Sequence, residues 1–152
     1  MVRFEPVGTA AEALVAAALS RHTPSDYFNT YARGELVYLA GSVPSDVVFI
    51  SNGSVSLLDP ISKEEICRIS GGDTVGLSCA LSKQALQFTA AAATLVDAFR
   101  LPLDFIDSAI ARDPAIVLTV SRLLSAEADT ALAALRCLKA RQSTRRRAMP
   151  AS

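Results

Sequence analysis

The side chains that could hold a metal ion or a redox centre are few and lie far apart in the sequence. The cysteines are Cys67, Cys79 and Cys137, and His22 is the only histidine. An iron–sulfur cluster usually takes four thiolates, and a metal site built on imidazoles needs more than one histidine. We therefore predict no cofactor and no metal. Three widely spaced cysteines without a CxxC pair also favour a reducing, cytoplasmic location.

Residue patterns that catalyse reactions are also missing. No Ser-His-Asp or Cys-His set has support in the sequence, and the paired acids Glu64 and Glu65 are most simply a solvated loop. We therefore predict that the protein is not an enzyme.

The stretch 71–94 is the most informative part of the chain for ligand binding. Two glycines and Asp73 begin it, and Gly76 follows three residues later. From residue 74 to residue 96 there is no Asp, Glu or Arg, and Lys83 is the only charged side chain. Burying an anion without a charged partner is costly. The composition therefore argues against a strongly bound anion here.

Length and composition predict one soluble globular domain. The chain has 152 residues, of which 51% are hydrophobic and 20% are charged, enough for one core. No apolar run approaches the roughly 20 residues that a membrane span needs, and no basic region precedes the first apolar run as in a signal peptide. We therefore expect no membrane partner.

Short strands separated by turn signals are predicted from residue 27 to residue 102. Asn52-Gly53 is one such signal, because this dipeptide accepts a positive φ at both turn positions. The clearest strand segments are 47–50, 54–58, 66–69 and 95–101. About seven short strands with turns every 8–12 residues are typical of a sandwich or barrel. A helix is predicted before them, over residues 10–19.

A long helix is predicted over residues 113–142, after a short one over 103–110. Asp113 suits the N-cap and Pro114 the first helical position. Positions that alternate steps of four and three residues form a coiled-coil seam, so we predict a symmetric homodimer. The seam consists of Val117, Ser121, Leu124, Ala128, Ala131, Leu135, Leu138 and Gln142.

A second stripe on the long helix can pack on the protein's own barrel. It consists of Ile116, Val120 and Leu123. The alternative to a dimer is that the whole helix lies on its own domain, with no role in pairing two subunits.

A basic segment ends an otherwise acidic chain. Residues 1–135 carry 9 basic and 15 acidic side chains, whereas residues 136–152 carry 6 basic side chains and no acid. We predict a domain over residues 1–142 followed by a basic, disordered tail over 143–152. Such a tail can solubilise the protein or make weak, salt-sensitive contacts with DNA phosphates.

Three short motifs lie in a fixed order along the predicted strands. They are Arg33-Gly34-Glu35-Leu36-Val37-Tyr38, Val48-Phe49-Ile50-Ser51-Asn52-Gly53-Ser54-Val55 and Gly72-Asp73-Thr74-Val75-Gly76. With the strand and helices that follow, this order resembles the cyclic-nucleotide-binding domain of the CRP/FNR family over residues 27–140. The resemblance implies a mainly β fold with flanking helices, namely a double-stranded β-helix (jelly-roll) barrel, and a C-terminal dimerisation helix.

The chain departs from this family where the ligand would bind. In the family, the segment after the third motif holds the cyclic phosphate, with a glutamate on the ribose and an arginine on the phosphate. Here Leu77 follows Gly76, and the arginine position falls among Leu86, Gln87 and Phe88. We therefore predict that neither cyclic AMP nor cyclic GMP binds.

The residues of this degenerate phosphate-binding cassette could still hold a small, mostly apolar ligand. They are Gly76, Leu77, Ser78, Cys79, Ala80, Gln87, Phe88, Thr89 and Ala90. The predicted polar contacts come from Ser78, Gln87 and Thr89, and the start of the long helix is expected to complete the pocket.

Two functions are compatible with these patterns. The first is the regulatory sensor domain of a CRP/FNR-type transcription regulator that signals through its dimerisation helix. The alternative is a stand-alone protein-interaction module of the same fold with no small-molecule ligand. A helix-turn-helix needs roughly 20 residues, more than remain after Gln142, so specific DNA binding would require a further domain. A cupin enzyme of the jelly-roll class is excluded, because cupins bind their metal with two or three histidines.

Overall fold

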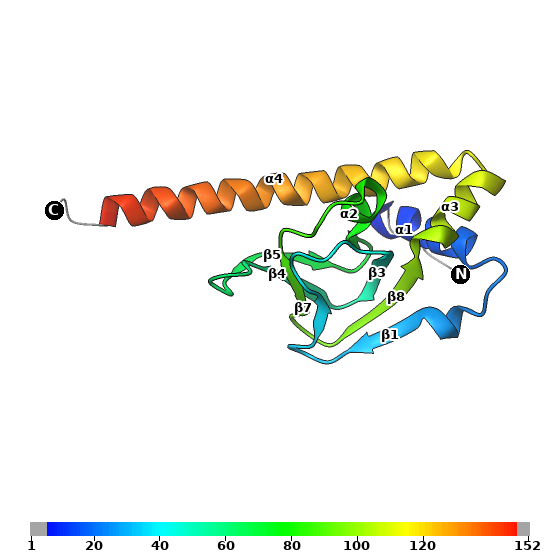
Figure 1. Ribbon diagram of the computed structural model, residues 1–152, viewed down its shortest axis with the longest axis horizontal. Coiled ribbons are helices and arrows are strands. Elements are labelled where there is room, and N and C mark those ends of the chain that lie inside the picture. Colours follow the sequence, from blue (N-terminus) through cyan, green and yellow to red (C-terminus); the bar gives the residue numbers. More distant parts are fainter. Residues whose placement is uncertain (1–5, 149–152) are drawn as a thin grey trace.

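The computed structural model describes the backbone of residues 6–148 and the side chains of residues 10–141. Two antiparallel four-stranded sheets form a jelly-roll, with helices packed along one side (Figure 1). The first sheet contains, in spatial order, β1 (Phe28–Tyr31), β8 (Val96–Pro102), β3 (Asp46–Asn52) and β6 (Thr74–Val75). The second contains β2 (Leu36–Tyr38), β7 (Thr89–Ala92), β4 (Ser54–Leu58) and β5 (Glu65–Ser70). The sheets do not close into a continuous barrel, but the predicted jelly-roll fold is confirmed.

The turn chemistry of the sequence fixes where the chain reverses direction. Gly53 joins β3 to β4 with φ +95°, a conformation that side chains with a Cβ rarely adopt. A Cβ at this position would clash with the backbone oxygen of Leu95. The Asn52-Gly53 signal therefore marks a real turn that favours glycine. It does not form a hairpin, because β3 and β4 lie in different sheets and only Gly53 of the two residues has a positive φ.

The helices form the second layer and share one core with the jelly-roll. They are α1 (Pro6–Ala18), α2 (Leu77–Ser82), α3 (Leu103–Arg112) and α4 (Ile116–Ala148), with a short 3₁₀ turn over Pro24–Tyr27. Ile116, Val120 and Leu123 of α4 are buried together with Leu14 of α1 and Ile106 of α3. The prediction that this stripe packs on the protein's own domain is confirmed.

The helix α4 lies along the whole jelly-roll (Figure 1). Asp113 does cap the preceding turn, because its Oδ1 accepts the Ala115 N–H at 3.1 Å, but α4 itself begins at Ile116. Further on, Arg141 donates from Nη1 to the Glu65 carbonyl oxygen of β5 at 3.1 Å. The jelly-roll therefore accompanies α4 as far as Arg141.

The backbone remains helical to Ala148, so residues 143–148 continue α4 where the sequence predicted a disordered tail. No glycine or proline lies between Pro114 and Pro150, and Ala, Arg and Gln are good helix formers. Residues 149–152 lie outside the described part of the chain. Over residues 6–148, no helix is both long enough and apolar enough to cross a membrane.

Candidate ligand pocket

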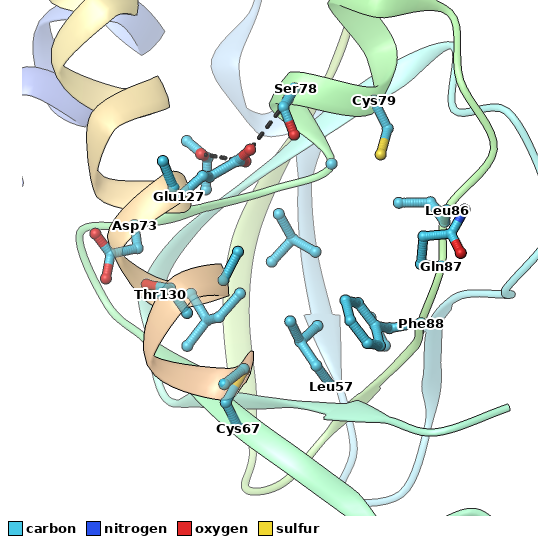
Figure 2. Close-up of a pocket in the computed structure, with 18 of the residues that line it drawn as sticks. Leu57, Cys67, Asp73, Ser78, Cys79, Leu86, Gln87, Phe88, Glu127 and Thr130 are labelled. Atoms are coloured by element: carbon cyan, nitrogen blue, oxygen red, sulfur yellow. Dashed lines mark hydrogen bonds between the residues drawn. The ribbon is translucent and has the colours of Figure 1, made fainter. Parts of the chain in front are cut away.

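A cavity of about 300 Å³ lies between the jelly-roll and α4 (Figure 2). Its walls come from both sheets, from the loop after α2, and from the middle of α4. The apolar lining consists mainly of Leu57, Ile69, Val75, Leu86, Phe88, Ala90, Leu124, Ala128, Ala131 and Ala134. This volume is at the small end of the range for small-molecule pockets. The cavity therefore has the size and surface of a site for a compact apolar molecule.

The structure brings most of the sequence-predicted cassette to this cavity. Gly76, Ser78, Cys79, Gln87, Phe88 and Ala90 line it. Leu77 and Ala80 do not line it and are instead buried in the core shared with α1 and α4. Thr89 is also buried outside the lining, and its Oγ1 accepts the Ala40 N–H at 3.3 Å. Of the three expected polar contacts, Ser78 and Gln87 therefore reach the cavity and Thr89 does not.

The segment after Gly76 forms a short helix, α2, which the sequence patterns did not predict. Gly76 has φ +84°, and a Cβ there would lie 3.1 Å from the Tyr38 ring. This left-handed residue turns the chain into α2 but carries no side chain that could cap the helix. The first N–H groups of α2 therefore need an acceptor from elsewhere in the molecule.

Glu127 of α4 supplies that acceptor (Figure 2). Its Oε1 accepts the Thr74 hydroxyl at 2.9 Å and the Leu77 N–H at 3.0 Å, while its Oε2 accepts the Ser78 N–H at 3.0 Å. Thr74 and Leu77 are both buried, so loss of the carboxylate would leave buried donors unpaired. One side chain thus ties α4 to β6 and to the start of α2.

The charged side chains at the cavity are acidic. Among the described residues that line it, Asp73 and Glu127 carry charge and none is basic. Burial, together with the negative charge of Glu127, raises the pKa of Asp73. Burial and the same charge raise the pKa of the Cys79 thiol. Lys83, the one basic residue from residue 74 to residue 96, is exposed at the C-terminal end of α2. The cavity therefore has a negative edge.

The opposite wall is held by a polar network around Tyr38. The Tyr38 hydroxyl donates to the Asp46 carbonyl oxygen at 2.7 Å, and the Arg100 guanidinium lies 4.6 Å from the centre of the Tyr38 ring. Arg100 also forms an ion pair with Asp46 at 2.8 Å. Burial and the Asp46 charge raise the pKa of the Tyr38 hydroxyl far above its ordinary value. Tyr38 is therefore a neutral, firmly placed wall of the cavity.

Comparison with known proteins identifies the family. The model for the cyclic nucleotide-binding domain matches residues 28–113, more than half of the chain. The chain belongs to the cyclic nucleotide-binding domain family. Domains of this family are regulatory rather than catalytic. No match was found among curated proteins.

Solved structures of bacterial proteins share the fold of this cyclic nucleotide-binding domain. A structure solved for a study of a cyclic-GMP-dependent signalling pathway that regulates bacterial phytopathogenesis is similar, with a TM-score of 0.62, 17% identity, and coverage of 77% of this chain and 89% of that chain. The catabolite activator protein of Thermus thermophilus is also similar, with a TM-score of 0.58, 16% identity, and coverage of 81% of this chain and 63% of that chain. At these identities the likeness concerns the fold alone. Within residues 6–148 no helix-turn-helix follows the long helix.

The predicted dimer residues of this domain share one side of α4 but differ in what covers them. Leu124, Ala128 and Ala131 line the cavity of their own domain, and Leu138 is half-buried. Val117 and Leu135 are exposed by 46% and 47%. Leu118 and Leu132, which the seam did not include, are exposed by 68% and 47%. The exposed apolar surface of α4 thus keeps Val117 and Leu135 of the predicted seam and adds Leu118 and Leu132 beside them.

Proposed function

We propose that this domain is the regulatory sensor of a CRP/FNR-type transcription regulator, and that its pocket takes a small, mostly apolar ligand in place of a cyclic nucleotide. The observation that carries the proposal is the cavity between the jelly-roll and α4, with its apolar walls and acidic edge. A cyclic phosphate would lose its water there without gaining a cationic partner, which is costly. A neutral apolar molecule would gain from the same walls.

The position of α4 supports a route for the signal. Leu124, Ala128 and Ala131 form part of the cavity wall, so an occupant touches the helix directly. An occupant that prefers one placement of α4 shifts the population of the domain toward that placement. We propose that α4 carries this change to a second subunit through its exposed stripe.

Calorimetric titration tests the choice of ligand. We expect no saturable heat with cyclic AMP or cyclic GMP, and micromolar binding of either nucleotide would contradict the proposal. Native mass spectrometry of protein purified gently from its host should show a bound small molecule and a dimer. If no ligand is retained, and the pocket binds no apolar probe, the alternative of a protein-interaction module is favoured.

Light scattering tests the dimer. Leu135→Asp places two like charges near one another across the proposed two-fold axis, so we expect a folded monomer where the wild type is a dimer. Ala133→Asp is the matched control, because Ala133 is exposed and lies about 160° around the helix from Leu135 at about 100° per residue. A wild type that is already monomeric, or a Leu135→Asp variant that remains dimeric, would show that α4 serves only its own domain.

A further inference from the structure

The contacts of Glu127 reach further than those of an ordinary helix cap. An ordinary cap is a residue just before the helix, but here Gly76 holds that position without a side chain. The acceptor comes from α4 and also binds the buried Thr74 hydroxyl of β6. The same carboxylate belongs to the cavity lining. A negative group of the protein itself therefore already occupies the donors at this edge of the pocket.

We propose that Glu127 determines the charge specificity of the pocket by acting as a built-in anion, so that neutral or cationic apolar molecules bind and anionic ones are rejected. This inference rests on the proposed function, because it requires that the cavity takes a ligand. An incoming anion would find the Leu77 and Ser78 N–H groups already bound to the carboxylate. It would also lie near the charges of Glu127 and Asp73, and like charges close together are unfavourable in a poorly solvated site.

Asp73 is the second acidic side chain at this edge, and burial raises its pKa. Asp73 stands on the cavity lining beside the start of β6, and its neighbour Glu127 contributes to the shift. In contrast, no basic side chain among the described lining residues could offset an added negative charge. The two carboxylates therefore act in the same direction on any ligand.

A matched pair of fluorescent probes tests the inference. N-phenyl-1-naphthylamine is neutral, and 8-anilino-1-naphthalenesulfonate has the same aromatic body with an added sulfonate. Both fluoresce strongly in apolar pockets. We expect the wild type to bind the neutral probe and to bind the sulfonate at least about tenfold more weakly, because the sulfonate must be buried beside carboxylates.

Two substitutions should reduce the difference in affinity between the neutral probe and the sulfonate. Glu127→Gln keeps the size and one oxygen acceptor but removes the charge, so the affinity for the sulfonate should rise about tenfold relative to the neutral probe. Asp73→Asn removes the other charge and leaves the contacts of α2 intact, so it should act in the same direction even if Glu127→Gln disturbs the fold. Asp129→Asn, an exposed acid on the same helix, is the control and should leave the ratio unchanged.

The ratio of the affinities for the two probes distinguishes a role of Glu127 in charge specificity from a purely structural role. A merely structural role of Glu127 would change the binding of both probes equally and leave the ratio as it was. If the wild type binds both probes alike, or if neither charge-removing variant alters the ratio, the inference is wrong while the apolar pocket stands. If neither probe enters the wild-type pocket, the proposed function fails and the inference fails with it.

Discussion

Replacing Arg100 with methionine should loosen the contact between the two sheets beside the pocket. Arg100 lies on β8 of the first sheet, and its Nη1 donates at 3.0 Å to the Val37 carbonyl oxygen of β2 in the second sheet. The same nitrogen donates to the Tyr31 hydroxyl at 3.0 Å, and Nε pairs with Asp46 at 2.8 Å. Methionine keeps much of the apolar stem over Tyr38 but removes the charge and these donors.

The free energy of unfolding lost in Arg100→Met should lie between the values for breaking a buried ion pair and an exposed ion pair. Breaking a fully buried pair costs about 3–5 kcal/mol, whereas an exposed pair contributes about 0.2–1 kcal/mol. The side chains of Arg100 and Asp46 are each 28% exposed, so solvent screens part of the interaction. We expect a loss of about 2–3 kcal/mol in the free energy of unfolding. At roughly 2–4 °C per kcal/mol for a domain of this size, Tm should fall by about 4–12 °C.

Urea unfolding followed by circular dichroism measures this change. Arg68→Met is the matched control, because Arg68 pairs with Glu65 at the surface and its loss should cost less than about 1 kcal/mol. A double-mutant cycle with Asp46→Asn isolates the pair and should show a coupling above about 1 kcal/mol. A loss below about 0.5 kcal/mol for Arg100→Met, or additivity in the cycle, would refute the view that this network holds the sheets together.

Two further predictions concern the turn glycine Gly53 and the thiols. Gly53→Ala should destabilise the domain by about 2 kcal/mol or more in a urea titration, because the turn needs a positive φ and the new methyl would meet the Leu95 backbone oxygen. A cost below about 0.5 kcal/mol would show that the turn relaxes freely. Cys137 is exposed and should react first with a thiol reagent. Cys67 and Cys79 should react slowly near neutral pH and faster as pH rises, because burial raises their pKa and the thiolate is the reactive form. Both line the cavity, so the neutral probe should slow them further, and equal rates for all three thiols would contradict this.

The jelly-roll could be predicted because its signals are local. Turn residues such as Asn52-Gly53 and Pro102 mark the ends of strands in the sequence itself, and β4 was predicted to the residue. The strand β7 was not predicted, because its run of alanines has low β propensity. That strand forms because it pairs on both sides, with β2 and with β4. Residue propensities do not predict such pairing.

The contacts of Glu127 with β6 and α2 at the pocket could not be predicted from the sequence. A search for charges near the cassette covers residues 74–96, whereas Glu127 reaches Leu77 from 50 positions further along the chain. Nothing at Glu127 itself is unusual, since a glutamate in a long helix is most often solvated. The useful signal was the uncapped start of α2 after Gly76, which left N–H groups without a local acceptor.

The predicted dimer seam on α4 stays a prediction, and some of its residues also line the protein's own cavity. The alternation of three and four residues locates an apolar surface but not what covers it. Leu124, Ala128 and Ala131 satisfy the coiled-coil pattern and nevertheless face their own cavity. A helix that packs on both its own domain and a partner has two adjacent apolar stripes. The sequence does not show which residues belong to which stripe.

Two hydrogen-bonded positions on α4, well apart along the helix, allow it to amplify a small tilt. Glu127 hydrogen-bonds to the Leu77 N–H beside the pocket, and Arg141 hydrogen-bonds to the Glu65 carbonyl oxygen on β5 of the second sheet. These points are about 21 Å apart at about 1.5 Å per residue. A tilt of about 5° around Glu127 would move Arg141 by about 2 Å, enough to break its 3.1 Å hydrogen bond. A tilt of α4 that barely changes the cavity would thus break the hydrogen bond between Arg141 and Glu65 at the other end of the contact.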